Sequence, residues 1–272
     1  MGALSLLLGT RSRLGQVATR KDQREQRRAE RRSREAEEQA KARRRRSIRY
    51  GGGSVLLAIC ALAALIIVSQ SGGTSGGDTS IEGVAAVQQQ LKGIPQQDTV
   101  LGAHKAKATI VEFGDLQCPV CQAFSTQITP SLISDVVRKG TANYEFRQYT
   151  IIGPQSTDAA RAAYAAGEQG RYWNFIELFY LNQGEENSGY VTGDFLTAIA
   201  RSAGVRNIAK WNADRRSSKW NSVLSGTQAE ASQLGFGGTP SILVEGPGGK
   251  RPFTGNSVPS LAQIENAVKA VS

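Results

Sequence analysis

The longest apolar stretch of the chain lies near its N-terminus and contains no charged residue. It spans residues 51–68, GGGSVLLAICALAALIIV, and with Ser69 and Gln70 it is about long enough to cross the hydrocarbon core of a bilayer. An arginine-rich flank precedes it, and such a flank stays on the cytoplasmic side. The pattern predicts a transmembrane anchor over 51–70, with residues 1–50 cytoplasmic. A cleaved signal peptide is the alternative, but no clear Ala-x-Ala site follows.

The positive charge of the chain belongs to the arm before this stretch. The net charge is +10, and residues 1–50 alone contain 16 Lys/Arg and 6 Asp/Glu, so the remainder is neutral. The arm cannot bury a core and is predicted to be solvated, while its basic end can attract anionic lipid. The neutral remainder gives no reason to expect nucleic acid as a partner.

Residues 71–97 are predicted to be a flexible linker that carries one short helix. Ser69–Ser80 is rich in Gly, Ser and Thr, a composition typical of a tether. Apolar residues at helical spacing predict an amphipathic helix over 81–91, and Gly93–Gln97 breaks it. The folded domain is therefore expected over 98–272.

A strand, a helix and a second strand are predicted next. Residues 107–114 form a nearly continuous apolar run, which is typical of a strand covered on both faces. Residues 122–139 continue a helix that Pro130 should kink or split. In residues 143–150 the side chains at alternate positions form two different faces, and this period of two predicts a second strand. A right-handed crossover then places the two strands parallel.

The rest of the domain is predicted to be mostly helical. Residues 156–234 are rich in Ala and carry aromatic side chains at helical spacing, with no credible strand. Their apolar stripe is interpreted as core packing; it comprises Tyr172, Phe175, Ile176, Phe179 and Tyr180. The chain then returns as a hairpin of strands over 241–245 and 251–254, and a final amphipathic helix is expected over 257–271.

The dithiol Cys118-Pro119-Val120-Cys121 lies between the first predicted strand and its helix. At a helix N-terminus the unpaired N–H groups and the helix dipole favour negative charge, so Cys118 should be stabilised as a thiolate. The thiolate is the nucleophile of disulfide exchange. Cys121 lies about one turn later and can close a disulfide with it, while Pro119 suits the first helical turn. The pattern predicts a redox-active pair.

Two other interpretations of the dithiol compete with redox chemistry. A zinc site needs four ligands and usually a second pair, but the chain contains three cysteines and one histidine, His104. Cys60 lies in the apolar stretch and is predicted to be apolar filler. A purely structural disulfide over so short a loop constrains little. We therefore expect no metal and no cofactor.

Glu112 interrupts the first apolar strand, six residues before Cys118. If the strand is covered on both faces, this carboxyl group is buried just below the dithiol and is a candidate proton relay. The alternative is a partly exposed strand from which Glu112 points into solvent.

The assembled order resembles the DsbA-like family of thiol-disulfide oxidoreductases, in its membrane-anchored bacterial form. The motifs that carry the resemblance are VEFGDLQCPVC at 111–121 and GTPS at 238–241, about 120 residues apart. The resemblance covers roughly residues 98–272. It implies an α/β, thioredoxin-like fold with an inserted helical subdomain over about 156–234, preceded by a single transmembrane helix.

The resemblance implies a role for each matching residue. Cys118 is the exposed nucleophile, Cys121 is the resolving thiol, and Glu112 handles the proton of the second thiol. Pro240 is a cis-proline that faces the dithiol, and proline lowers the cost of a cis bond. The backbone at Thr239 then pairs with a bound peptide.

One departure from the family concerns the redox potential. Val120 stands where the best-known oxidases carry histidine, so Cys118 should be less acidic and the disulfide less oxidising. Pro119 and Val120 are therefore expected to tune the site, and the direction of catalysis stays open.

The resemblance implies an enzyme of the cell membrane whose catalytic domain lies outside the cytoplasm. Its substrates are unfolded or cysteine-containing exported proteins, since disulfides persist in oxidising compartments. The leading interpretation is a disulfide-forming oxidase that a membrane redox partner recycles. A reductase or isomerase of the same fold is one alternative. A non-catalytic module that binds peptides is another, although the intact dithiol argues against it.

Overall fold

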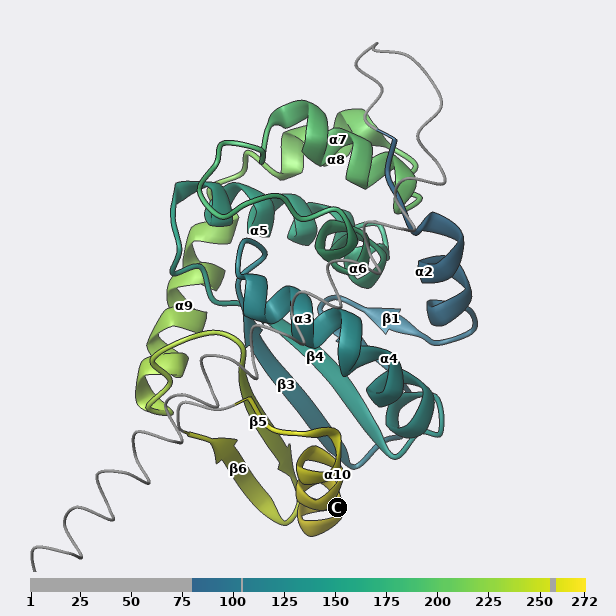
Figure 1. The fold of residues 1–272 in the computed structure, drawn as a ribbon, viewed down its shortest axis with the longest axis vertical. Helices are drawn as coiled ribbons and strands as arrows, with labels where there is room; N and C mark the ends of the chain where they lie inside the picture. Colours follow the sequence, from purple (N-terminus) through teal and green to yellow (C-terminus); the bar gives the residue numbers. More distant parts are fainter. Residues whose placement is uncertain (1–79, 104, 255–257) are drawn as a thin grey trace, which may run out of the picture. The chain divides into compact units, whose positions relative to one another are not determined.

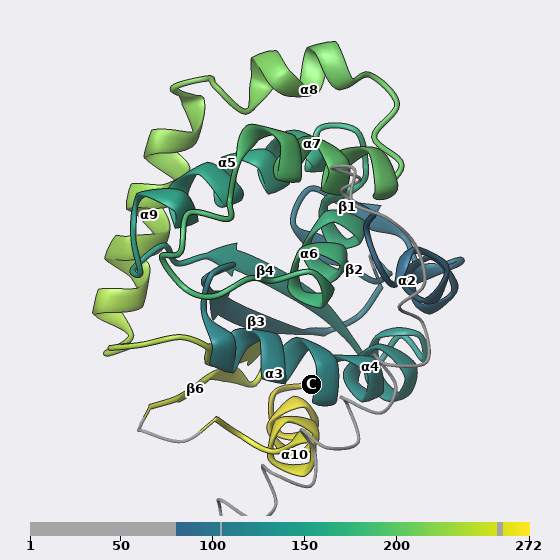
Figure 2. The ribbon, with the colours of Figure 1, turned by 45° about the horizontal axis from the view of Figure 1, so that its top comes forward.

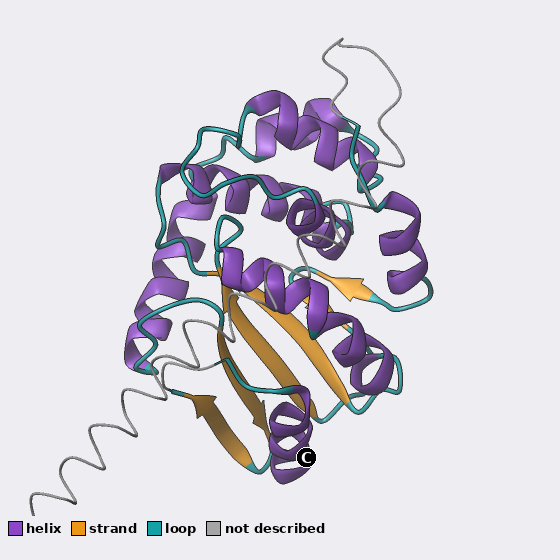
Figure 3. Ribbon diagram, in the orientation of Figure 1, coloured by secondary structure: helices purple, strands orange, loops and turns teal. Residues whose placement is uncertain are grey.

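A mixed β-sheet forms the centre of the part of the chain that the structure describes (Figures 1 and 3). This computed structural model describes residues 80–103, 105–254 and 258–272. The strand order within them is β1-β2-β4-β3-β5-β6. The strands are β1 (Gln96–Gln97), β2 (Val100–Leu101), β3 (Ala108–Gly114), β4 (Ala142–Gln148), β5 (Ser241–Gly246) and β6 (Gly249–Phe253).

The helices of the described residues cover this sheet and extend beyond it. They are α2 (Val84–Leu91), α3 (Pro119–Gln127), α4 (Thr129–Leu132), the π-helix η1 (Ile133–Val137), α5 (Pro154–Gly167), α6 (Tyr172–Leu181), α7 (Gly193–Ser202), α8 (Ile208–Asp214), α9 (Lys219–Gln233) and α10 (Leu261–Val271).

Strand β3 is the central strand and is covered on both faces. It pairs in parallel with β4 and antiparallel with β5. Because side chains alternate along a strand, Ile110 joins the main apolar core while Val111 and Phe113 join a smaller cluster on the other face. The predicted strand over 107–114 and its parallel partner are therefore confirmed, with β3 beginning at Ala108.

The two faces of the sheet are covered by different parts of the chain. Helices α3, α4 and α10 lie against one face, as Figure 1 shows, and Phe124, Leu132 and Ile264 belong to the same core as Ile110. On the other face, Ala231 of α9 and Phe236 after it cover Phe113. The site described below lies where β3 ends between these two layers.

Helices α5 to α9 follow β4 and precede β5, where the helical subdomain was predicted. Figure 2 shows α7 and α8 on the far side of α5 and α6 from the sheet. In α6 all residues from Tyr172 to Tyr180 are buried, so the predicted stripe is core, as expected. The indole N–H of Trp173 donates to the Thr99 carbonyl oxygen at 3.0 Å, which ties α6 to the β1–β2 turn.

The helix after the dithiol is split, as Pro130 led us to expect. Helix α3 ends at Gln127, Ile128 separates it from α4, and Pro130 lies in the first turn of α4. There its missing N–H costs no helical hydrogen bond. The continuation is a π-helix over Ile133–Val137 rather than α-helix up to 139.

Two predicted helix starts are wrong by a few residues. Helix α10 begins at Leu261, not at 257, because Ser260 forms a capping box with Gln263. Helix α5 begins at Pro154, before the predicted helical stretch over 156–234, since proline suits the first helical position.

The sheet begins before residue 98, the predicted start of the domain. Gln96 and Gln97 form β1 and pair with β2, and α2 packs on α6. The segment over 84–97 therefore belongs to the folded unit, because its apolar residues Val87 and Leu91 are buried in the core. The predicted anchor over 51–70 and the arm over 1–50 lie outside the described residues, among which no helix could cross a membrane.

Candidate active site

The dithiol lies at the start of α3, directly after β3 and its connecting loop. Cys118 is the N-cap residue of α3, and its sulfur accepts a hydrogen bond from the backbone N–H of Cys121 at 3.4 Å. Pro119 occupies the first helical position. Cys118 is 6% exposed and Cys121 is fully buried, and both are free thiols. An incoming sulfur therefore reaches Cys118 more easily than Cys121.

The loop before β5 faces the first thiol. The Cys118 thiol donates to the Thr239 carbonyl oxygen at 3.4 Å, across 121 residues of sequence. The Thr239–Pro240 peptide bond is cis, as the resemblance implies. The structure thus brings the two predicted motifs together.

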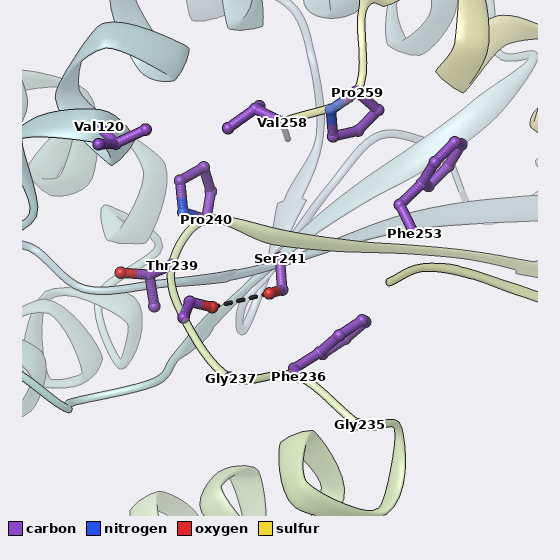
Figure 4. Close-up of a pocket in the computed structure, with 11 residues that line it drawn as sticks. Val120, Gly235, Phe236, Gly237, Thr239, Pro240, Ser241, Phe253, Val258 and Pro259 are labelled. Carbon is purple, nitrogen blue, oxygen red and sulfur yellow. Dashed lines mark hydrogen bonds between the residues drawn. The ribbon is translucent and has the colours of Figure 1, made fainter. Parts of the chain in front are cut away.

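A hollow of about 540 Å³ opens beside this contact. Figure 4 shows its lining residues, which come from α3, from the loop before β5, from β6 and from the segment before α10. Val120 is 49% exposed there, among the largest exposures of any apolar side chain in the described residues. A hollow lined by apolar side chains and by a glycine-rich loop suits an extended peptide.

The two thiols differ in acidity. Hydrogen bonds from the Cys121 thiol, the Thr239 side chain and the helix N–H groups lower the pKa of Cys118 to about 6, although burial opposes them. Burial raises the pKa of Cys121 well above its ordinary value. Cys118 is therefore mostly thiolate at neutral pH, as predicted from its position at the helix start, without a charged group at Val120. Cys121 stays protonated.

Glu112 is buried below the dithiol, not turned to solvent. It is 2% exposed, and its Oε2 accepts a hydrogen bond from the Tyr144 hydroxyl. Burial, together with the charges of Glu177 and Cys118, raises its pKa to about 8, against the Tyr144 hydrogen bond. Its negative charge in turn raises the pKa of Cys121. Glu112 therefore holds a proton at neutral pH close to the second thiol.

Asp115 holds the loop between β3 and the dithiol, a role that the sequence did not reveal. Its fully buried carboxylate accepts the backbone N–H of Gln117 at 2.9 Å and those of Ile151 and Ile152 at 2.9 and 3.0 Å. These bonds connect the segment between β3 and Cys118 to the segment that follows the parallel strand β4. The bonded groups lie up to 37 residues apart, so only the folded chain shows them.

The helical subdomain also contacts the dithiol loop. The Gln183 side chain donates to the carbonyl oxygens of Leu116 and Cys118 at 2.7 and 3.2 Å. The Tyr180 hydroxyl donates to the Asp115 carbonyl oxygen at 3.2 Å. The insertion therefore fixes the position of the nucleophile. No group of three or more potential metal ligands occurs among the described residues.

The sheet is thioredoxin-like, with a Cys-x-x-Cys at a helix start and a cis-proline opposite it. These features are typical of the thioredoxin class of proteins. Residues 95–258 match the thioredoxin family, to which this chain therefore belongs. The chain is 28% identical over 149 residues to the probable disulfide bond formation protein D of Bacillus cereus, covering 54% of this chain and 69% of that protein.

Two further comparisons narrow the class. The disulfide bond formation protein D of Bacillus subtilis is 31% identical over 131 residues, covering 47% of this chain and 55% of that protein. The crystal structure of oxidised BdbD from Bacillus subtilis has the same fold, with a TM-score of 0.56 at 22% identity, covering 65% of this chain and 95% of that one. Within the thioredoxin family, the chain is a DsbA-like thiol-disulfide oxidoreductase.

Proposed function

We propose that this chain is a membrane-anchored oxidase that forms disulfides in exported proteins. The observation that carries the proposal is the unequal dithiol, in which Cys118 has a lowered pKa and keeps 6% of its surface exposed, while Cys121 has a raised pKa and is fully buried. A stable thiolate on Cys118 favours the reduced protein, and a dithiol whose reduced form is stabilised is a strong oxidant. The curated relatives are named for disulfide bond formation, which agrees with this direction.

The reaction starts from the oxidised protein. A substrate thiolate attacks the sulfur of Cys118, the Cys118–Cys121 bond breaks, and Cys121 leaves as a thiolate that takes a proton from Glu112. A second substrate thiol loses its proton to solvent and attacks the substrate sulfur of the mixed disulfide, which releases Cys118 as a thiolate. The substrate loses two electrons and the protein gains two. Solvent returns a proton to Glu112.

Thr239 and Pro240 are proposed to bind the substrate backbone. The loop before β5 lines the hollow beside Cys118, so an extended peptide there lies within reach of the nucleophile. Its side chains would meet Val120, Phe253 and Val258 (Figure 4). Unfolded proteins can bind at this site because their chain is free to adopt an extended conformation.

The site is proposed to work outside the cytoplasm. The apolar stretch over 51–68 and its arginine-rich flank support a single-pass anchor with residues 1–50 inside the cell. A membrane redox partner is then needed to reoxidise the dithiol after each turnover. A reductase or isomerase is the rival function. The exposed Val120 brings no positive charge to Cys118, and this favours the rival function.

The experiment that tests the proposal is transfer of one disulfide. Oxidised full-length protein, mixed with an equal amount of a reduced two-cysteine peptide at pH 7, is expected to yield oxidised peptide and reduced protein. Mass spectrometry after acid quenching counts the free thiols of each. Peptide that stays reduced while a small dithiol reduces the protein would overturn the oxidase assignment.

A further inference from the structure

The two oxygens of the Glu112 carboxyl group have different surroundings. Oε2 accepts a hydrogen bond from the Tyr144 hydroxyl of β4, whereas Oε1 is buried without a hydrogen-bond partner in the part of the chain that the structure describes. Buried polar atoms are nearly always hydrogen-bonded, so an unpaired oxygen in the core calls for an explanation. The mechanism above places a proton on Glu112 but gives Tyr144 no role.

The unpaired Oε1 lies toward the end of β3 that leads to the dithiol. A Cβ atom added at Gly114, the last residue of this strand, would lie 3.2 Å from Oε1 and 2.5 Å from the Phe146 ring. The absence of a side chain at Gly114 therefore leaves room for Oε1 there. Burial raises the pKa of Cys121, and a hydrogen bond from the Asp115 backbone opposes this rise. That bond places the second thiol beside the residue that follows Gly114.

The bonded Oε2 is held in the other direction along the strand. In the register of the parallel pair, Tyr144 lies beside Ile110, two residues before Glu112, whereas Gly114 lies two residues after it. The hydrogen bond from Tyr144 therefore draws Oε2 toward the start of β3 and leaves Oε1 toward its end.

The hydrogen-bond directions determine which oxygen carries the proton of the neutral acid. A tyrosine hydroxyl has one proton, and Tyr144 donates it to Oε2. In the 3.3 Å contact between the Tyr144 and Thr129 hydroxyls, the donor is therefore Thr129. A protonated carboxyl group has one O–H, and its carbonyl oxygen is the better acceptor. Since Oε2 accepts, the proton of Glu112 is on Oε1.

We propose that Tyr144, itself held by Thr129, is the positioning residue that keeps the proton of Glu112 on the oxygen toward the dithiol. Tyr144 acts on the reaction only through Glu112, and the inference rests on the proposed function. Tyr144 and Thr129 are both buried, so solvent does not compete for their hydroxyl groups. Without the Tyr144 hydroxyl, the carboxyl group can rotate about its terminal bond, and its proton loses the productive orientation.

The test replaces Tyr144 by phenylalanine in the full-length protein. Phenylalanine keeps the ring that packs on Trp173, with centroids 4.7 Å apart, and removes only the hydroxyl. At pH 6 Glu112 is protonated, because its pKa is raised to about 8. Its infrared C=O band should move to higher frequency in Tyr144→Phe, since a carbonyl oxygen that loses a hydrogen bond has a stiffer bond. Comparison with Glu112→Gln identifies the band.

A kinetic measurement accompanies the spectrum. Single-turnover reduction of the oxidised protein by a reduced two-cysteine peptide should slow about a hundredfold in Glu112→Gln and about tenfold in Tyr144→Phe, where the acid remains but loses its orientation. In the double variant, the loss of the hydroxyl should add nothing to the effect of Glu112→Gln. A merely structural role of Tyr144 would not produce this non-additivity.

Tyr172→Phe is the matched control. It removes another buried hydroxyl of the same core, which donates to the Phe146 carbonyl oxygen at 3.0 Å. Because this hydroxyl donates to the backbone and not to Glu112, its loss should leave the Glu112 band and the rate of reduction unchanged.

Thr129 offers a second variant if Tyr144→Phe does not fold. Thr129→Val keeps the shape of the side chain and removes the donor to Tyr144, so the Glu112 band should move in the same direction, but by less than in Tyr144→Phe. Thr129→Ser retains the hydroxyl and should restore the wild-type band. A band that does not move in Thr129→Val would then count against the inference.

The outcomes separate this inference from the proposed function. A Glu112 band at the same frequency in wild type and Tyr144→Phe overturns the inference, whatever the turnover. Effects of Tyr144→Phe and Glu112→Gln that add in full also overturn it. Wild type that exchanges no disulfide overturns the proposed function, while the infrared band still decides whether Tyr144 holds Glu112.

Discussion

Replacing Cys118 by serine is expected to reduce disulfide transfer to the rate seen without protein. Serine forms no disulfide, and Cys121 is fully buried with a pKa well above its ordinary value, so it cannot substitute as the nucleophile. Replacing Cys121 instead should trap a mixed disulfide with a substrate that carries a single cysteine, because Cys118 remains reactive and neither Cys121 nor a second substrate thiol is present to resolve the bond. Non-reducing gels and mass spectrometry of the protein with a reduced exported substrate and an external oxidant measure both.

Cys60→Ser is the matched control for this pair. It removes the remaining cysteine of the sequence and should leave disulfide transfer at the wild-type rate. Transfer that survives Cys118→Ser but is lost with Cys60→Ser would show that the reaction depends on Cys60 and not on Cys118. That result would contradict the account. A Cys121→Ser protein that accumulates no mixed disulfide would contradict the division of roles.

The second large effect is on stability. The pKa of Glu112 is raised from 4.5 to about 8 in the folded protein, so between these values the folded state binds a proton that the unfolded state lacks. The contribution of Glu112 to the free energy of unfolding is therefore complete below about pH 4.5. It falls as the pH rises toward 8, by about 1.4 kcal/mol per pH unit. Glu112→Gln removes this loss and should gain about 3 kcal/mol on wild type between pH 5 and pH 7.5.

Urea unfolding of the oxidised proteins at several pH values measures this difference. The oxidised form is used because the Cys118 thiolate then makes no contribution. Glu185→Gln changes an exposed carboxyl group, and its stability relative to wild type should be nearly constant with pH. A constant difference for Glu112→Gln as well would show that Glu112 is charged in the folded state, contrary to the structure.

The central strand and the dithiol could be predicted because both are local patterns. The apolar run around Glu112 predicted a strand covered on both faces, and this alone placed the acid in the core. The position of Cys118 before a helix predicted the direction of its pKa shift. The approach of Thr239 to Cys118 followed only from the family resemblance, since 121 residues separate them.

The surroundings of Glu112 could not be predicted in the same way. Tyr144 pairs with Ile110 in the sheet register, yet its hydroxyl reaches Glu112, and no pattern within either strand specifies that diagonal contact. Glu177 is the one carboxyl group in the apolar helix YWNFIELFYL. Its partners lie on α2 and α3, so its burial depends on how three helices pack.

The measurement that tests the central claim most directly is the reduction potential of the Cys118/Cys121 pair. The full-length protein is equilibrated at pH 7 with mixtures of reduced and oxidised glutathione, and the fraction of protein disulfide is determined after quenching. The account predicts an oxidising value of about −120 to −180 mV, because the reduced form gains a stabilised Cys118 thiolate. A value near −270 mV would contradict it, and would mean that Val120 has turned the site toward reduction.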